Sequence, residues 1–447
     1  SLLGWVFYMP MALAGVPPAV FGIVALIDLL YQFWVHTEHV PKLGWFDRVF
    51  CSPSNHRVHH AVNDGYIDKN YGGLLVLWDR LFGSFREETV PCVYGTRSPL
   101  NSWDPLWANA EVYWALLQTS WRCSRWRDKV LVWFKPPGWQ SDTMARESPR
   151  AAFDIARVQT FEPPMSRGTL VFSVACFGLL LGGIATFLWH ADAMPMATAA
   201  IWCATLSAGL WVLGAVMQGR LGILQGLMVV SAALATATSA LGLVGLHQIF
   251  KPLTMLIAIS FIAIHEISTW ANAHFDHKLR AGWLLAALAA SLAGDVALML
   301  PGNFFIAGLA SFLVAHLFYI ALFRHSTPGS GWFPSRSALL ATLLVGGAMY
   351  AFVYPGLPGQ VLKVAVAAYV VVIALMAAQA IGRAAVLRTP ASVAVAVGAG
   401  FFMLSDSLLA INRFVQPLPL SGLWVLSSYY AAQVLIAFHI LPRNPAA

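Results

Sequence analysis

Residues 169–188 read TLVFSVACFGLLLGGIATFL and contain no charged side chain. A helix of this length is about 30 Å long, which is the thickness of the hydrocarbon core of a bilayer. Nine more apolar segments follow at 197–217, 221–246, 253–270, 282–300, 304–323, 337–353, 361–381, 391–411 and 422–441. The sequence therefore predicts an all-α, polytopic transmembrane protein.

The composition supports this prediction. Hydrophobic residues make up 58% of the 447 residues and charged residues only 11%, which excludes the soluble class. The net charge of +7 comes from Lys and Arg in short loops between apolar segments, where the positive-inside rule expects them. We therefore attribute the charge to topology and anionic lipids, and we expect no nucleic-acid partner. The five cysteines form no CxxC pair and predict neither a zinc site nor a disulfide framework.

Two regions precede these segments. Residues 2–35 form an apolar stretch interrupted by GVPP at 15–18, which predicts a membrane hairpin. The chain opens on Ser1 without the basic start or cleavage site of a signal peptide, so we expect a start inside a longer domain. Residues 36–167 are polar, aromatic and basic and predict a membrane-apposed region. We divide the chain into domains at 1–166, 167–220 and 221–441.

The basic loops predict an orientation with the histidine-bearing region and the C-terminus in the cytoplasm. The cations that then share that side are Arg220, Lys278, Arg280, Arg324, Arg336, Arg383, Arg388 and Arg443. Lys363 departs from the pattern but can extend to the membrane surface. Lys251 and Arg413 lie beside apolar segments at the opposite face, where an anionic partner or ligand would explain them.

The strongest chemical signal is the sequence HRVHH at 56–60. On a helix, positions i, i+3 and i+4 share a face, so His56, His59 and His60 can converge, and His36 ends the preceding apolar run. Neutral imidazoles suit iron, zinc or copper. The alternative is an interfacial helix whose histidines only reach the surface, but three histidines on one stripe seldom arise from packing.

A family resemblance rests on QFWVHTE at 32–38, PKLGWF at 41–46, PSNHRVHH at 53–60, IDKNYGG at 67–73 and WDRLFG at 78–83. This part of the chain resembles the fatty acid hydroxylase/sterol desaturase superfamily, and most closely its alkylglycerol monooxygenases. The resemblance implies a di-iron, O2-dependent hydroxylation of lipid C–H bonds that uses an electron donor, for which it points to a pterin. It also implies that His56, His59 and His60 are the last histidine box and His36 an auxiliary ligand. No histidine precedes His36, so the earlier boxes of such a di-iron site are missing from residues 1–166.

Ionisable residues within the predicted spans are the second chemical signal. Asp295, His316 and Asp406 lie inside apolar segments, where such groups are costly and therefore functional candidates. The predicted orientation brings both aspartates to the end of the bundle that carries Lys251 and Arg413. The alternative is two structural ion pairs that hold helices together.

A second resemblance rests on KPLT at 251–254, SLAGDVAL at 291–298, FIAGL at 305–309, AHLFY at 315–319, SDSLLAINRF at 405–414 and YYAAQ at 429–433. Residues 221–441 resemble the lysoplasmalogenase (YhhN) family. The resemblance implies eight spans and hydrolysis of the vinyl ether bond of lysoplasmalogens, with release of a fatty aldehyde.

The residues suit that reaction. A carboxylic acid can protonate the vinyl ether carbon while a second carboxylate stabilises the oxocarbenium ion or activates water, which are roles for Asp295 and Asp406. Lys251 and Arg413 can hold the phosphate head group, and His316 is a third candidate contact to substrate.

We thus predict an integral membrane enzyme of ether lipids that combines both activities, with membrane lipids and an electron donor as partners. The alternatives are a sterol or fatty acid hydroxylase with a non-catalytic membrane scaffold, or a proton-coupled transporter. The sequence predicts no oligomeric state.

Overall fold

A computed structural model of the chain describes residues 4–441 except 137, 148–152, 270–274, 303, 328 and 330. Ser1, Arg443 and Trp270, the last residue of the predicted segment 253–270, lie outside the described residues. The chain divides into two compact units, residues 1–163 and 164–447. Within the described ranges all regular elements are helices, apart from two isolated β-bridges, so the all-α prediction is confirmed.

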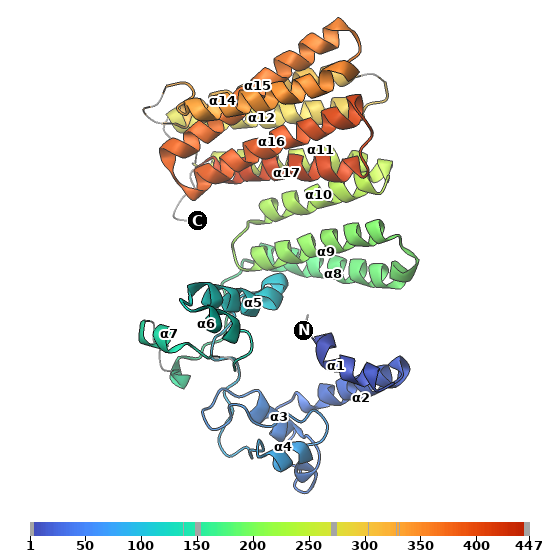
Figure 1. The fold of residues 1–447 in the computed structure, drawn as a ribbon, viewed down its shortest axis with the longest axis vertical. Helices are drawn as coiled ribbons and strands as arrows, with labels where there is room; N and C mark the ends of the chain where they lie inside the picture. The colour runs from blue at the N-terminus through green and yellow to red at the C-terminus, as the bar shows by residue number, and fades with distance from the viewer. Residues whose placement is uncertain are drawn as a thin grey trace. The chain divides into compact units, whose positions relative to one another are not determined.

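The first unit begins with the predicted hairpin, α1 (Gly4–Leu13) and α2 (Pro18–Val35) (Figure 1). The turn between them contains Gly15 at φ +82°, and Tyr8 meets Phe21 edge-on with ring centroids 4.9 Å apart. Short helices and long loops follow. They are η1 (Phe46–Arg48), α3 (Pro53–His59), α4 (Leu77–Phe82), α5 (Pro105–Arg122), α6 (Trp126–Leu131), α7 (Asp142–Glu147) and η2 (Ile155–Arg157).

The second unit is built from ten long helices among the described residues. They are α8 (Arg167–His190), α9 (Met196–Met217), α10 (Ile223–Ala240), α11 (Val244–Thr269), α12 (Phe275–Met299), α13 (Phe305–His325), α14 (Arg336–Val353), α15 (Gly359–Leu387), α16 (Pro390–Phe414) and α17 (Ser421–His439). These ten and α2 are each long and apolar enough to cross a membrane. The ten predicted spans are therefore confirmed in number, and the protein is an integral multi-pass membrane protein. The predicted segment 221–246 is too long, because α10 ends at Ala240 and α11 already begins at Val244 after a turn with Gly242 at φ +69°.

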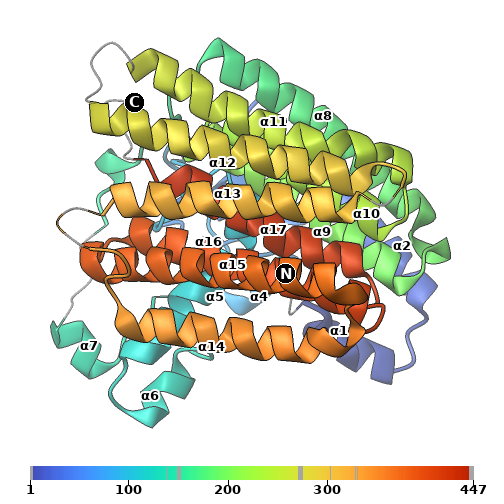
Figure 2. The ribbon, with the colours of Figure 1, turned by 90° about the horizontal axis from the view of Figure 1, so that it is seen from above.

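Seven helices of this unit form a closed ring. Along it α10 packs on α11, α11 on α12, α12 on α13, α13 on α15, α15 on α16, α16 on α17, and α17 back on α10. Of the three other helices, α8 packs on α9 and α9 on α10, while α14 lies outside the ring beside α15 at the edge of the bundle (Figure 2). Fully buried Met255, Leu288, Phe323, Phe402 and Ile436 meet in the ring's interior. The ring creates an interior in which polar groups have only one another as partners.

Close approach of α16 to α17 depends on Gly398. A Cβ atom there would lie 3.1 Å from the carbonyl oxygen of Ala432 and 3.0 Å from the side chain of Ile436. Small residues let helix backbones approach in membranes, where dispersion contacts replace the hydrophobic effect between helices. Two residues later, Gly400 faces open space, with nothing within 4 Å of its Cβ position.

We therefore expect Gly398→Ala to lower the free energy of unfolding by about 1–3 kcal/mol through overpacking, as in other filled cores. Gly400→Ala is the matched control and should leave stability unchanged. Thermal unfolding of both detergent-purified variants measures the difference. Equal melting temperatures for the two variants would mean that the α16–α17 contact is looser than described.

Candidate functional site

The histidine cluster of the first unit is positioned by the start of α3. Ser52 caps this helix by accepting a hydrogen bond from the backbone N–H of Asn55, and Pro53 occupies its first turn. A defined start fixes the rotation of the helix, and hence the direction of His56 and of His60, which directly follows its last residue.

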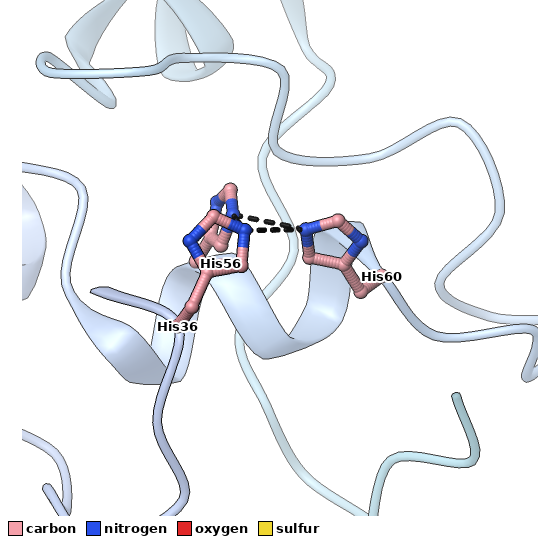
Figure 3. A group of neighbouring side chains, drawn as sticks. All are labelled: His36, His56 and His60. Carbon is pink, nitrogen blue, oxygen red and sulfur yellow. Dashed lines mark hydrogen bonds between the residues drawn. The ribbon is translucent and has the colours of Figure 1, made fainter. Parts of the chain in front are cut away.

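Three imidazoles converge on one point (Figure 3). The Nε2 atoms of His36 and His56 are 2.9 Å apart, those of His56 and His60 are 3.0 Å apart, and those of His36 and His60 are 3.1 Å apart. Nitrogens about 2.1 Å from a metal ion and about 90° apart would be separated by roughly 3.0 Å. The triangle therefore matches one face of an octahedral ion such as iron, and the residues fit the metal that the family resemblance implies.

The protonation of these rings also suits a metal. The Nδ1 atom of His36 lies 2.5 Å from the carbonyl oxygen of Gln32, so Nδ1–H donates there and leaves the Nε2 lone pair free. Burial, followed by the neighbouring histidines, lowers the pKa of His56 to about 3, and burial likewise lowers the pKa of His60. Three mutually adjacent imidazole Nε2 atoms cannot all hydrogen-bond to one another, whereas a metal ion can accept a lone pair from each of them.

His59 does not join this group. Its ring is exposed, its Nδ1 lies 3.3 Å from the carbonyl oxygen of Lys69, and it approaches Tyr71 with ring centroids 6.0 Å apart. On a helix, positions i+3 and i+4 flank position i on opposite sides. His36 lies beside His60, so His59 is left on the other flank of His56.

Arg57 joins the segment after His36 to α3, a role that the sequence analysis missed. Its guanidinium donates to the backbone oxygens of Thr37 at 3.1 Å and Val40 at 3.0 Å. It also forms a bidentate pair with Glu88, at 3.0 and 2.7 Å. No spacing signature links an arginine to a glutamate so far along the chain, so only the folded structure reveals this pair.

Asp406 on α16 is the centre of a second cluster, in the helical bundle. The Tyr369 hydroxyl donates to Asp406 Oδ2 at 2.6 Å. His316 Nε2 lies 2.9 Å from that hydroxyl and 3.4 Å from the same carboxylate oxygen. His316 is completely buried, and Tyr369 was not a predicted site residue because a tyrosine in an apolar span carries no distinguishing sequence signal.

Asp406 also faces a narrow cavity of about 80 Å³ between α14 and the ring. Along α16 the cavity wall runs from Met403 to Phe414, which is about 17 Å of helix. Besides Asp406 and Tyr369, the cavity is lined mainly by apolar side chains, among them Leu309, Phe312, Val345, Met349, Val366, Ile373 and Leu409. The shape and lining suit an extended hydrocarbon chain that passes a single carboxylate.

Asp295 belongs to a separate network. Its carboxylate lies 3.2 Å from Lys251 Nζ and accepts a hydrogen bond of 2.7 Å from the Tyr429 hydroxyl. Gln433 continues the network by donating to Tyr429 and accepting from Tyr319 at 2.6 Å. Only 7% of Lys251 is exposed, so this cation is occupied by an internal ion pair.

The ring of Phe402 lies between the two networks. Its centroid is 4.9 Å from that of His316 and 5.6 Å from that of Tyr429. The two aspartates therefore come to the same part of the bundle, but each has its own partners, and only Asp406 lines the cavity.

Arg413 is exposed at the end of α16 beside the cavity. Its guanidinium carbon lies 4.1 Å from the ring centre of Phe305 and 5.9 Å from that of Phe414, and both rings line the cavity. Within the described part of the chain it has no carboxylate partner. It is thus free to meet an anion at the cavity's edge.

The two clusters lie in segments of the chain that are similar to two different protein families. Residues 1–84 match the fatty acid hydroxylase family, and residues 246–440 match the YhhN family. The chain joins a fatty acid hydroxylase-like segment to a YhhN-like segment. His36, His56 and His60 fall in the first match, and Asp295 and Asp406 fall in the second.

Individual relatives agree with this division. The chain is 37% identical over 183 residues to alkylglycerol monooxygenase of Homo sapiens, covering 40% of each chain. It is 43% identical over 136 residues to alkylglycerol monooxygenase of Danio rerio, covering 30% of each. It is 33% identical over 158 residues to lysoplasmalogenase TMEM86A of Bos taurus, covering 34% of this chain and 63% of the relative. The chain thus spans well under half of these monooxygenases, and no solved structure matches it.

We expect His60→Ala to lower the affinity of the purified chain for Fe²⁺ at least tenfold, because it removes one of three converging ligands. His39→Ala removes an exposed histidine outside the cluster and should bind iron as the unmodified chain does. Iron content after equilibrium dialysis measures both. Equal iron binding by the two variants would show that the triangle is not a metal site.

Proposed function

We propose that residues 221–441 hydrolyse the vinyl ether bond of lysoplasmalogens and that residues 1–166 belong to an iron-dependent oxygenase of alkyl ether lipids. The observation that carries the first proposal is the carboxylate of Asp406 in the wall of an otherwise apolar cavity. The names of the lysoplasmalogenase and alkylglycerol monooxygenase relatives support the substrate class.

In the proposed hydrolysis, the Asp406 carboxylic acid protonates the vinyl ether carbon and leaves an oxocarbenium ion. Water adds to this ion and returns a proton to the carboxylate, giving a hemiacetal. The hemiacetal then breaks its bond to the glycerol oxygen and releases a fatty aldehyde. Since Asp406 Oδ2 already accepts from Tyr369 and His316, the transferable proton is held on Oδ1.

Arg413 and His316 have different roles in the proposed hydrolysis. Arg413 follows Asp406 by seven residues, which is two helical turns and about 10 Å along the same face of α16. That span suits a phosphate at Arg413 and a vinyl ether, beyond the glycerol, at Asp406. His316 lies behind Asp406 and orients it, although it was predicted to touch substrate.

Asp295 and Lys251 act together in the proposed site. Their ion pair and their absence from the cavity lining favour a positioning role over direct contact with substrate. Lys251 is therefore an unsuitable phosphate ligand. Asp295 contributes to the reaction by fixing Tyr429, which packs edge-on against Phe312 in the cavity wall at 5.8 Å.

For the first unit, we propose that His36, His56 and His60 hold one iron ion, with His59 free for a second. Iron bound there would supply activation of O2 for lipid C–H hydroxylation. Arg57 keeps His36 in reach of α3, and an adjoining cavity of about 490 Å³ lined by His36, His56 and His60 offers space for substrate. A reduced pterin as electron donor rests on the family resemblance alone. The cytoplasmic placement of this unit rests on the basic loops.

Asp406→Asn should lower lysoplasmalogen hydrolysis by about two to four orders of magnitude, because the amide keeps the shape but cannot deliver the proton. Asp295→Asn should mainly lower the melting temperature, because it leaves Lys251 buried without its partner.

Aldehyde release and thermal unfolding are measured on the same purified full chains in liposomes. Full activity in well-folded Asp406→Asn would refute the assignment. Proton-coupled flux of lipid without aldehyde would instead support a transporter.

Arg413→Ala should raise KM about tenfold and change kcat little, because a head-group contact is made in the ground and transition states alike. Lys363→Ala is the matched control, since Lys363 lies over the Tyr354 ring without lining the cavity. Steady-state hydrolysis of a lysoplasmalogen in mixed micelles gives both constants. A loss confined to kcat would place Arg413 in the chemical step and remove it from phosphate binding.

A further inference from the structure

A group of unpaired hydrogen-bond donors lies toward the end of the bundle opposite Arg413. Arg383 on α15 is only 6% exposed, and its Nε and Nη1 atoms have no partner. Arg280 Nε, Trp283 Nε1 and Gln379 Nε2 are also buried without a partner. Among the described residues no carboxylate pairs with either arginine.

These donors come from two helices, α12 and α15, and on each helix the spacing of the two residues places them on one face. Arg280 and Trp283 are three residues apart on α12, and Gln379 and Arg383 are four apart on α15, so each pair shares a face. The two guanidinium groups lie near enough for their like charges to interact. The Gln379 side-chain oxygen already accepts from the Phe333 backbone N–H at 2.9 Å, so its amide NH2 is the half left unpaired.

The N-terminus of α14 adds positive potential beside Arg383. A Cβ atom on Gly382 would lie 3.3 Å from the backbone nitrogen of Ser335, the residue that caps α14. The first turn of this 18-residue helix therefore begins against the backbone one residue before Arg383. Helix N-termini attract anions because their N–H groups lack internal partners and the dipole is positive there.

Physical chemistry makes this arrangement costly without a ligand. A buried guanidinium with unpaired N–H groups loses hydration and gains nothing in return, and a second positive charge nearby adds repulsion. The Lys251–Asp295 pair shows how the same bundle treats a buried cation when an internal partner exists. Here the missing partner is an anion.

We propose that Arg280 and Arg383 bind a phosphate group, with the Gln379 amide and the α14 N-terminus as further donors. The planar forks of two guanidinium groups match phosphate oxygens, which accept several hydrogen bonds at once. The phosphate comes from a lipid head group or from soluble phosphate. The site is separate from Arg413: along α15, Lys363 lies near the Arg413 end and Arg383 about 30 Å away. The proposal therefore goes beyond the proposed hydrolysis and does not depend on it.

The test is thermal unfolding of the delipidated full chain in detergent with two probes. One is inorganic phosphate at constant ionic strength, and the other is phosphatidic acid in the micelles, compared with phosphatidylcholine. We expect a saturable rise in melting temperature, with the apparent dissociation constant raised at least tenfold in Arg383→Met and Arg280→Gln. Arg388→Gln removes an exposed charge just after the same helix and should respond as the unmodified chain does.

The melting temperatures of the variants without any added phosphate provide a second test. Without phosphate, Arg383→Met should melt no lower than the unmodified chain, because an orphan buried charge has been replaced by an apolar side chain. A response to phosphatidic acid at far lower concentration than to inorganic phosphate identifies a lipid ligand, and the reverse order identifies a soluble one. No saturable response to either probe overturns the proposal, as does an unchanged response in Arg280→Gln. The latter variant decides the matter if Arg383→Met does not fold.

Discussion

The constraint that governs the second unit is the burial of polar side chains among the apolar side chains inside its helical ring. A charged or polar side chain there must find a partner on a neighbouring helix, since hydrocarbon offers none. Lys251 pairs with Asp295, which also accepts a hydrogen bond from Tyr429, while Asp406 contacts Tyr369 and His316. These contacts cross between helices and therefore set how the ring closes. A polar group that lacks such a partner then points to a ligand.

The first unit meets a different constraint, because short helices and loops supply little apolar core. Among the described residues of this unit, the buried hydrophobic cluster consists of Val58, Ala61 and Tyr66. Buried hydrogen bonds hold this unit together instead. The Asn70 side chain bonds the backbone of Asn55 and of Arg86. The Asp79 carboxylate accepts hydrogen bonds from two successive backbone N–H groups, those of residues 71 and 72, and from the Ser84 hydroxyl. Such fully paired networks hold the histidine helix in one orientation.

How much the sequence could reveal follows from the range of each interaction. The ten spans were predictable because a bilayer imposes length and apolarity on each segment separately. Helical spacing was enough to predict that His56 and His60 lie close together. It could not predict that His59 lies outside the cluster, because that depends on which side of His56 the His36 ring packs. Tyr369 and Arg57 could not be found, because their partners lie on other elements. For Lys251 and Asp295, the sequence left a structural ion pair and a substrate site open, and the structure shows the ion pair.

That ion pair also limits how the proposed hydrolysis can proceed. A carboxylate whose charge is offset by Lys251 at 3.2 Å stabilises a distant cation weakly, and Asp295 does not line the cavity. Once Asp406 has given up its proton in the proposed reaction, its own negative charge can stabilise the oxocarbenium ion. The same group can then orient the attacking water and recover its proton from it. In the proposed cycle, one carboxylate, held on one oxygen by Tyr369 and His316, performs both of the roles that two carboxylates share in glycosidases.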